Sequence, residues 1–257
     1  MSAKTAPKQP AKAVPLTTNK AARPKGHASG RPPKQVVIKT DEATLSISSK
    51  NYSSWSLRGW LMAKMAGLNF REERVNVESA DARAELLLLA PSILVPCLSH
   101  RGVRVWDTLA IGEYLNEVAP KAGLLPSDLV QRAHCRSICG EMHSGFSAMR
   151  ASLPMNIRAR FTSFKVWSKA QADIDRIVEI WTDCLSKYGG PFLFGRSLTL
   201  ADAMFAPVAS RFTTYAVVLP PACARYRDSM MELPLMQEWI ADALEEPEEL
   251  DELDMTF

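Results

Sequence analysis

The chain has few of the features that mark secreted, membrane-spanning or nucleotide-driven proteins. Its five cysteines form no CxxC pair and no secretory leader is recognisable, so we expect no disulfide framework and a reducing, intracellular and cytoplasmic setting. The longest apolar run, residues 86–98, contains two prolines and is shorter than the roughly 20 residues that span a bilayer. P-loop, GxGxxG, HExxH and GxSxG patterns are also missing, so nucleotide-driven, zinc-protease and serine-hydrolase activities lack support.

Residues 1–40 lack acidic and aromatic side chains altogether. They contain nine Lys or Arg and six prolines, so the net charge of +3 combines +9 here with −6 in the remaining 217 residues. Such a segment cannot bury enough apolar surface to offset its ordering entropy, and we predict a disordered, solvated basic tail. The prolines oppose the amphipathic helix of an organelle presequence, and without interleaved aromatics we do not expect the tail to bind nucleic acid. Targeting and contact with an anionic surface are the alternatives.

The region after the tail alternates strand and helix patterns. Residues 43–49 alternate apolar and polar side chains as a strand does, and apolar residues then recur at helical spacing from Leu57 until Gly67 ends the helix. Further elements are expected as a strand at 72–77, a helix at 80–89, a hairpin of 95–98 with 103–106, and a helix at 108–118. The order β-α-β-α-β-β-α predicts a compact mixed-sheet domain over residues 43–118.

From residue 128 onward the pattern is helical, with no convincing strand. Candidate helices span 129–153, 162–188, 200–215 and 233–244, and residues 120–126 form a plausible linker ahead of them. Thr199 and Asp202 form a capping-box-like start of the third of these helices. We therefore predict an all-helical domain over residues 128–246 and interpret the acidic segment 245–254 as a frayed surface tail.

The most informative segment is residues 50–58, where the first strand leads into the first helix. Ser53 and Ser54 precede the apolar helical repeat, so a hydroxyl there lies beside the positive end of the helix. The unpaired N–H groups of such a helix, together with a serine hydroxyl, can stabilise an anion. The alternative is that Ser53 only caps the helix, a role that serine often fills.

One group of residues resembles a metal site but has the wrong spacing. His134 lies beside Cys135, Cys139 and His143, and the last three share one helix face at four-residue steps. Residues eight apart on a helix are separated by about 12 Å along its axis, which is too far for one zinc ion with bonds near 2.0–2.3 Å. We expect buried thiols and no metal.

Three motifs, in this order and spacing, resemble the cytosolic glutathione transferase superfamily. They are Ser53-Ser54-Trp55-Ser56-Leu57-Arg58, Ala90-Pro91-Ser92-Ile93-Leu94-Val95-Pro96, and Trp106-Asp107-Thr108-Leu109-Ala110-Ile111-Gly112-Glu113-Tyr114-Leu115. The segment from Leu198 to Asp202 resembles the capping box of the family's helical domain. The resemblance covers residues 43–246 and implies a thioredoxin-like, glutathione-binding domain followed by an all-helical substrate domain, that is, an α/β domain plus an all-α domain.

The resemblance also implies roles for individual residues. The first motif is nearest the serine-type zeta class, with Ser53 as the residue that activates the thiol of glutathione and Ser54 beside it. Trp55 replaces the cysteine of that class, which speaks against mixed-disulfide chemistry. Val95 pairs with the cysteinyl part of glutathione before a cis Pro96, for which a trans proline is the alternative. Asp107 and Thr108 bind the γ-glutamyl end, or simply cap a helix.

Glutathione as co-substrate, with no metal, is thus the expected chemistry, and an electrophilic small molecule is the expected second substrate. Candidates for the pocket of this second substrate are Arg58, Met142, His143, Phe146 and Arg150, although residues of these types are more often core or ion-pair residues. The leading interpretation is a glutathione S-transferase acting in detoxification. The alternatives are a maleylacetoacetate isomerase-like activity and a non-catalytic binding module. By resemblance we also expect a homodimer.

Overall fold

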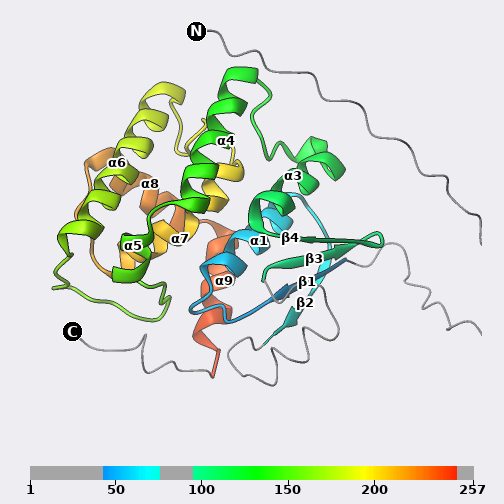
Figure 1. Ribbon diagram of the computed structural model, residues 1–257, viewed down its shortest axis with the longest axis horizontal. Helices are drawn as coiled ribbons and strands as arrows, with labels where there is room; N and C mark the ends of the chain where they lie inside the picture. Colours follow the sequence, from blue (N-terminus) through cyan, green and yellow to red (C-terminus); the bar gives the residue numbers. More distant parts are fainter. Residues whose placement is uncertain (1–42, 76–94, 248–257) are drawn as a thin grey trace, which may run out of the picture. The chain divides into compact units, whose positions relative to one another are not determined.

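In the computed structural model, residues 43–75 and 95–247 are described. The N-terminal half of the described chain contains a four-stranded sheet with the strand order β2-β1-β3-β4. The strands are β1 (Ala43–Ile47), β2 (Phe70–Arg74), β3 (Cys97–His100) and β4 (Val103–Trp106). β1 pairs parallel with β2 and antiparallel with β3, and β3 forms a hairpin with β4. Figure 1 shows α1 (Ser54–Met65) and α3 (Thr108–Val118) together on one side of these strands.

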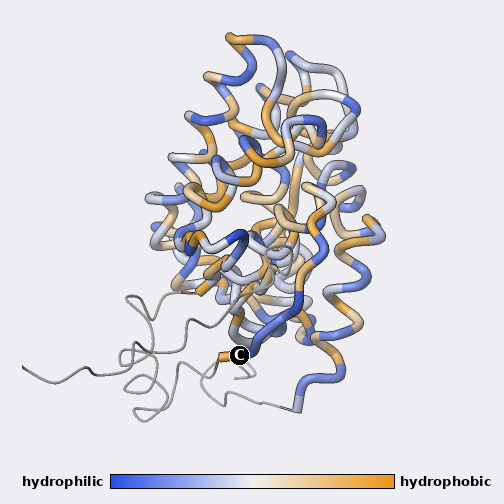
Figure 2. Tube along the Cα trace, turned by 90° about the vertical axis from the view of Figure 1, so that its right-hand side faces the viewer, coloured by the Kyte–Doolittle hydropathy of each residue, from blue (hydrophilic) through white to orange (hydrophobic). Residues whose placement is uncertain are grey.

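Helices make up the remainder of the described chain. A short 3-10 turn, η1 (Pro120–Ala122), lies within the predicted linker. The helices that follow are α4 (Leu129–Ser144), α5 (Ser147–Ser152), α6 (Ser168–Tyr188), α7 (Leu200–Thr214), α8 (Pro221–Met231) and α9 (Pro234–Leu244). Figure 2 shows hydrophilic and hydrophobic stretches alternating along the helices, as expected for helices with one face in a core. Among the described residues, no helix is long and apolar enough to cross a membrane.

The buried core is continuous between the sheet domain and the helices. α7 is buried along nearly its whole length and packs against both α1 and α4. Leu200 at the start of α7 lies so close to Gly112 of α3 that a Cβ at this glycine would lie 2.5 Å from a Leu200 methyl carbon. The capping box predicted for this helix is confirmed, because Asp202 accepts hydrogen bonds from the N–H and hydroxyl groups of Thr199.

Several predicted elements have the expected bounds and others do not. The helix at 108–118 is confirmed, as is the burial of the Cys135 and Cys139 thiols. The hairpin is also confirmed, although its first strand, β3, runs over Cys97–His100 instead of 95–98. The single helix predicted for 129–153 is wrong, because the chain breaks at Gly145 and at Phe146, whose φ is 62°. The helix predicted from residue 162 begins only at Ser168, and α8 was not predicted. The predicted basic tail, the helix at 80–89 and most of the 245–254 segment lie outside the described residues.

The interpretation of residue 246 as part of a frayed tail is wrong. The Glu246 side chain is fully buried, and its carboxylate accepts hydrogen bonds from the N–H groups of Lys50 and Asn51 at 2.5 and 3.0 Å and from the Ser49 hydroxyl at 2.7 Å. The carboxylate is the acceptor of the Lys50 N–H and shares the Asn51 N–H with the Ser49 hydroxyl, so it satisfies backbone groups of the loop before α1. The end of the helical part therefore holds the loop that leads to Ser53.

Candidate active site

Ser53 caps the N-terminus of α1. Its Oγ accepts a hydrogen bond from the N–H of Ser56 at 3.3 Å and donates to the Ser56 hydroxyl at 2.9 Å, so the predicted capping role is confirmed. The first turn of α1 contains no acidic residue, and the N-terminus of the helix keeps its positive potential. Ser53 is partly exposed, whereas Ser54 is buried. Of the two predicted serines, Ser53 is therefore the one whose hydroxyl a ligand can reach.

The hydroxyl of Ser56 is held from the preceding strand. Its Oγ accepts a hydrogen bond from the Ser48 N–H at 3.1 Å, and the Ser56 side chain is fully buried. Ser48, Ser56 and Ser53 thus form a short chain of hydrogen bonds that ends at the partly exposed hydroxyl. Such a chain fixes the orientation of its last member, because each group has a defined donor or acceptor.

The peptide bond between Val95 and Pro96 is cis, which confirms the predicted isomer. Pro96 is buried and lies directly against α1: a Cβ at Gly59 would lie 2.6 Å from the Pro96 Cγ. Only glycine leaves room for the proline ring at this distance. The partly exposed Val95 is thereby kept in a fixed position relative to the helix that begins at Ser53.

Asp107 and Thr108 lie at the start of α3 and are joined to α4 by one histidine. Asp107 caps α3 by accepting hydrogen bonds from the N–H groups of Leu109 and Ala110, so the predicted capping role is also confirmed. Its other carboxylate oxygen lies 3.0 Å from Nε2 of His143, and the Thr108 hydroxyl lies 3.3 Å from Nδ1 of the same ring. The structure therefore brings together three residues that were predicted separately for two substrates.

Trp55 lies at the centre of the remaining candidate residues. The guanidinium carbons of Arg58 and Arg150 lie 4.7 and 4.9 Å from the Trp55 ring, and the His143 ring meets it edge to face at 5.2 Å. Both arginines also contact the Met142 sulfur, at 3.4 and 3.5 Å. Trp55, which the sequence analysis treated only as a lost cysteine, is thus a ring between two cations.

Three arginines in this region, of which Arg58 and Arg211 are buried and Arg150 is partly exposed, form no ion pair with a carboxylate among the described residues. Arg58 and Arg211 are almost fully buried and donate to the backbone oxygens of Met204 and Leu153, and Nη1 of Arg211 has no hydrogen-bond partner. Burial, and then the charge of Arg150, lowers the pKa of Arg58 well below its ordinary value and that of Arg211 to about 9. Burial also lowers the pKa of Arg150, with Asp173 acting in the opposite direction. Keeping these side chains charged therefore lowers the stability of the folded state.

Two family models account for most of the described chain. One, described as the N-terminal domain of glutathione S-transferase, matches residues 52–118, and the other, described as its C-terminal domain, matches residues 144–242. Together they cover more than half of the sequence. The chain belongs to the glutathione S-transferase family. The family and the class of enzyme predicted from the sequence are thereby confirmed, and so is the fold of a thioredoxin-like domain followed by an all-helical one.

Relatives of this glutathione S-transferase include proteins named for both candidate activities. A probable maleylacetoacetate isomerase of Caenorhabditis elegans is 24% identical over 70% of this chain and 85% of its own length. Glutathione S-transferase Z2 of Arabidopsis thaliana is 26% identical over 76% of this chain and 90% of its own. The crystal structure of maleylacetoacetate isomerase from Anaeromyxobacter dehalogenans, which contains bound glutathione, superposes with a TM-score of 0.58 at 24% identity and covers 80% of this chain and 97% of that chain. This structural likeness supports the fold.

Sequence reasoning missed two residues of this region in the glutathione S-transferase. Ser56 was part of the first motif but was given no role. Arg211 was not singled out, although it is the one cation of the largely apolar helix α7 and that pattern could have revealed it. Phe146, predicted for the pocket of the second substrate, is buried at the break between α4 and α5.

Proposed function

We propose that this glutathione S-transferase activates the thiol of glutathione at Ser53. The observation that carries the proposal is a partly exposed seryl hydroxyl at the N-cap of a 12-residue helix with no acid in its first turn. A thiol of ordinary pKa ~8.5 is mostly protonated at neutral pH, and a hydroxyl donor with a helix N-terminus favours the thiolate. Lowering the thiol pKa by about two units corresponds to about 2.7 kcal/mol.

The hydrogen bonds around Ser53 suggest how its hydroxyl becomes available to donate to the sulfur of glutathione. In the structure the Ser53 hydroxyl donates to Ser56. When a thiolate lies beside the helix, the Ser53 hydroxyl turns toward the sulfur, and the Ser56 hydroxyl donates to Ser53 in return. Ser56 is a positioning residue in this scheme, because Ser48 holds it and it does not touch glutathione.

The rest of glutathione is assigned to residues around the same helix. Val95, held by Pro96 against α1, offers its backbone to the cysteinyl part. Asp107 takes the γ-glutamyl ammonium group, and the Thr108 hydroxyl with N–H groups at the start of α3 takes the γ-glutamyl carboxylate. His143 contacts both side chains in the structure, so it must give up at least one of these contacts when glutathione binds.

Turnover with glutathione tests the assignment of Ser53. Ser53→Ala should lower kcat/KM roughly 20-fold at pH 7, because the thiolate fraction falls when the pKa returns to its ordinary value. The affinity for glutathione should change little, and Ser54→Ala is the matched control because Ser54 is buried. Full activity of Ser53→Ala would transfer the role to Ser54 or Tyr52. A natural chain that binds no glutathione would instead support the non-catalytic binding module.

The buried arginines favour a second substrate that carries negative charge. Arg58, Arg150 and Arg211 lie close enough for their charges to interact and form no ion pair with a carboxylate of the described residues, so an anion that enters the site would compensate them. Arg58 and Arg150 lie against Trp55, two residues after Ser53, which supports a position of this charge near the proposed sulfur site. We infer an electrophile with at least one carboxylate.

This observation also favours isomerisation of an unsaturated diacid as a second candidate function. The thiolate adds to one carbon of the double bond, the electron pair moves onto the adjacent carbonyl-conjugated carbon, the single bond rotates, and the thiolate leaves as the double bond re-forms. Glutathione is regenerated, so catalytic amounts suffice. Turnover of a cis-unsaturated dicarboxylate with substoichiometric glutathione supports isomerisation, whereas consumption of one glutathione per product supports transfer.

We further propose a homodimer in the cytoplasm. β4 is an edge strand whose Val103 and Trp106 side chains are exposed, and Leu129 and Val130 are exposed at the start of α4. Edge strands with exposed apolar residues are usually covered, and a two-fold interface would cover this one. Light scattering tests this: the chain should have twice its monomer mass of 28.4 kDa, and Trp106→Glu should reduce it to that mass. A monomeric natural chain would contradict the proposal.

A further inference from the structure

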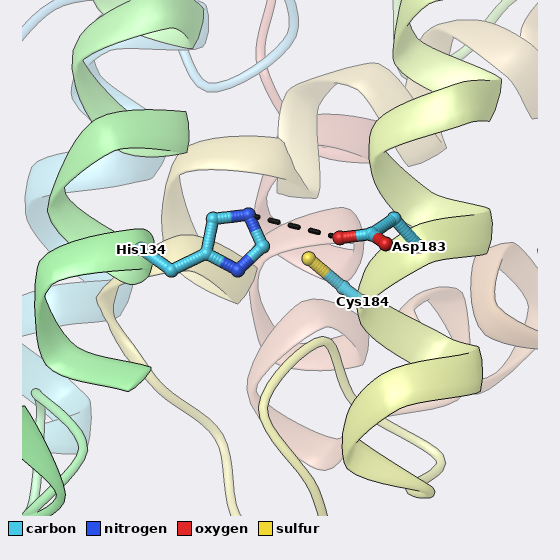
Figure 3. A group of neighbouring side chains, drawn as sticks. All are labelled: His134, Asp183 and Cys184. Carbon is cyan, nitrogen blue, oxygen red and sulfur yellow. Dashed lines mark ion pairs between the residues drawn. The ribbon is translucent and has the colours of Figure 1, made fainter. Parts of the chain in front are cut away.

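A second group of potential ligand atoms lies between α4 and α6, apart from the residues assigned to glutathione. His134 of α4 and Asp183 and Cys184 of α6 each offer one ligand atom, and these three atoms lie within 4.8 Å of one another. Figure 3 shows the His134 ring extending from α4 toward both side chains of α6, with Nε2 facing Asp183 at 3.9 Å. Nitrogen, oxygen and sulfur ligands thus converge from two helices.

The two helices meet in a regular antiparallel pairing at this point. Seven residues after His134, Glu141 of α4 forms a bidentate ion pair with Arg176, which lies seven residues before Asp183 on α6. Seven residues are about two helical turns, so the two contacts lie on the same face of each helix. The approach of His134 to Asp183 and Cys184 therefore lies between the same facing sides of α4 and α6 as this ion pair.

Nδ1 of His134, the ring nitrogen that does not face Asp183, has a hydrogen-bond partner of its own. Nδ1 lies 2.8 Å from the hydroxyl of Tyr188, which follows Cys184 by one turn of α6, and the ring packs against Tyr188 and Phe194. Metal-binding histidines commonly use one ring nitrogen for such a second partner, which orients the ring and leaves the other nitrogen for the ion. Here that other nitrogen is Nε2, which faces the two side chains of α6.

The three side chains differ in their exposure to solvent. Cys184 is fully buried, His134 is partly exposed and the Asp183 side chain is mostly exposed. An ion can therefore approach from solvent past Asp183 and reach the sulfur behind it. Two ligands of a tetrahedral zinc ion are separated by roughly 3.6 Å, so side chains of the group must move together by up to about 1 Å when an ion binds.

We propose that His134, Asp183 and Cys184 bind a divalent transition-metal ion, with zinc as the ion that best suits this ligand set. A thiolate and a carboxylate balance the charge of the ion, and the neutral imidazole adds a third bond. Water occupies the fourth position on the exposed side. His134 precedes His143 by nine residues, or about 13 Å along α4, so the ion joins two helices of the helical domain and takes no part in thiol activation.

Cobalt(II) bound to the full-length chain tests the proposal without reference to activity. We expect one equivalent to give the sulfur-to-cobalt charge-transfer absorption of a thiolate ligand, and zinc to displace it. Cys184→Ser should abolish this absorption, while Cys139→Ser, which changes a buried cysteine of α4 outside the group, should leave it intact. Asp183→Asn changes an exposed side chain, so the fold is not at risk; it should keep the absorption and weaken the affinity.

The partner of His134 provides a second measure. Tyr188→Phe retains the ring but removes the hydroxyl at Nδ1, and it should weaken metal binding about 10- to 100-fold. Circular dichroism of each variant reports whether it has folded. The proposal is overturned if the natural chain gives no thiolate absorption with cobalt, if Cys184→Ser retains it, or if Asp183→Asn and Tyr188→Phe both bind with unchanged affinity.

Discussion

Replacing Arg211 by methionine should stabilise the fold while it removes one cation of the proposed site for a negatively charged second substrate. The side chain is 5% exposed and its Nη1 has no hydrogen-bond partner. Burial, with Arg150, lowers the pKa of Arg211 from 12.5 to about 9, which corresponds to a cost of about 5 kcal/mol for keeping it charged. Loss of its hydrogen bond to the Leu153 oxygen costs about 1–3 kcal/mol.

The balance favours Arg211→Met by about 2–4 kcal/mol, or roughly 5–10 °C in Tm. The sign of the pH dependence follows from the lowered pKa. Below pH 9 the arginine is charged in both states and the cost is fully present, whereas above pH 9 the folded state releases its proton first, so the natural chain gains stability relative to the variant. Denaturant unfolding from pH 6 to 10 should show a constant difference up to about pH 9 and a smaller one above it.

A control variant and a measurement with a dicarboxylate ligand complete this experiment. Arg136→Met removes an exposed arginine that pairs with Glu113 and should change stability by less than about 1 kcal/mol. A dicarboxylate such as maleate should raise the Tm of the natural chain and of Arg136→Met, but not that of Arg211→Met. Clear destabilisation by Arg211→Met, or an unchanged response to the dicarboxylate, would refute the reasoning from the unpaired buried charge.

Three further changes test other parts of the structure. Glu246→Ala removes the acceptor of the buried Lys50 N–H, whereas the Asn51 N–H keeps the Ser49 hydroxyl as its other acceptor. The variant should lower the unfolding free energy by about 1–3 kcal/mol and raise the thiol pKa of bound glutathione, measured by thiolate absorbance; an unchanged pKa would separate this loop from Ser53. Gly59→Ala should lower the free energy of unfolding by about 1–3 kcal/mol and weaken glutathione binding, because the added Cβ would clash with Pro96. In the control Gly140→Ala on α4, the added Cβ meets open space and should raise the free energy of unfolding by up to about 1 kcal/mol. Equal effects of the two changes would contradict the tight fit of Gly59 against Pro96. The hydrogen bonds to Arg136 lower the pKa of Glu113. The small stabilisation from this pair should therefore be present above the ordinary carboxyl pKa of 4.5 and be lost as the pH falls through the lowered pKa. In acid unfolding, Glu113→Gln should not show this decrease in stability.

Local signals predicted the elements whose ends depend on neighbouring residues. Gly102, with φ of 74°, turns the hairpin, and Asp107 caps α3, so these bounds could be read from the sequence. The break between α4 and α5 could not, because Phe146 adopts a φ of 62° that its residue type does not favour. α8 was not predicted, although its first residue is Pro221 and a proline is well suited to the first position of a helix.

The candidate site divides in the same way. Ser53, Pro96, Asp107 and Thr108 belong to contiguous motifs, and the predicted caps and the cis bond are confirmed, while their roles toward glutathione stay predictions. The contacts among Trp55, His143 and the arginines depend on packing between α1, α4 and α7, which no local pattern encodes. Glu246 lies 196 residues after its partner Lys50, and its sequence context of acidic residues is typical of a solvated end.

The bond between residue 246 and the loop before α1 has a consequence for biosynthesis. Lys50 and Asn51 leave the ribosome almost two hundred residues before the only described carboxylate that accepts their N–H groups. The sheet domain can bury its apolar residues early, but the segment that carries Ser53 acquires these partners only when residue 246 has been translated. A fragment that ends before residue 246 should therefore contain every motif of the sulfur site and still lack the contacts that hold it in register.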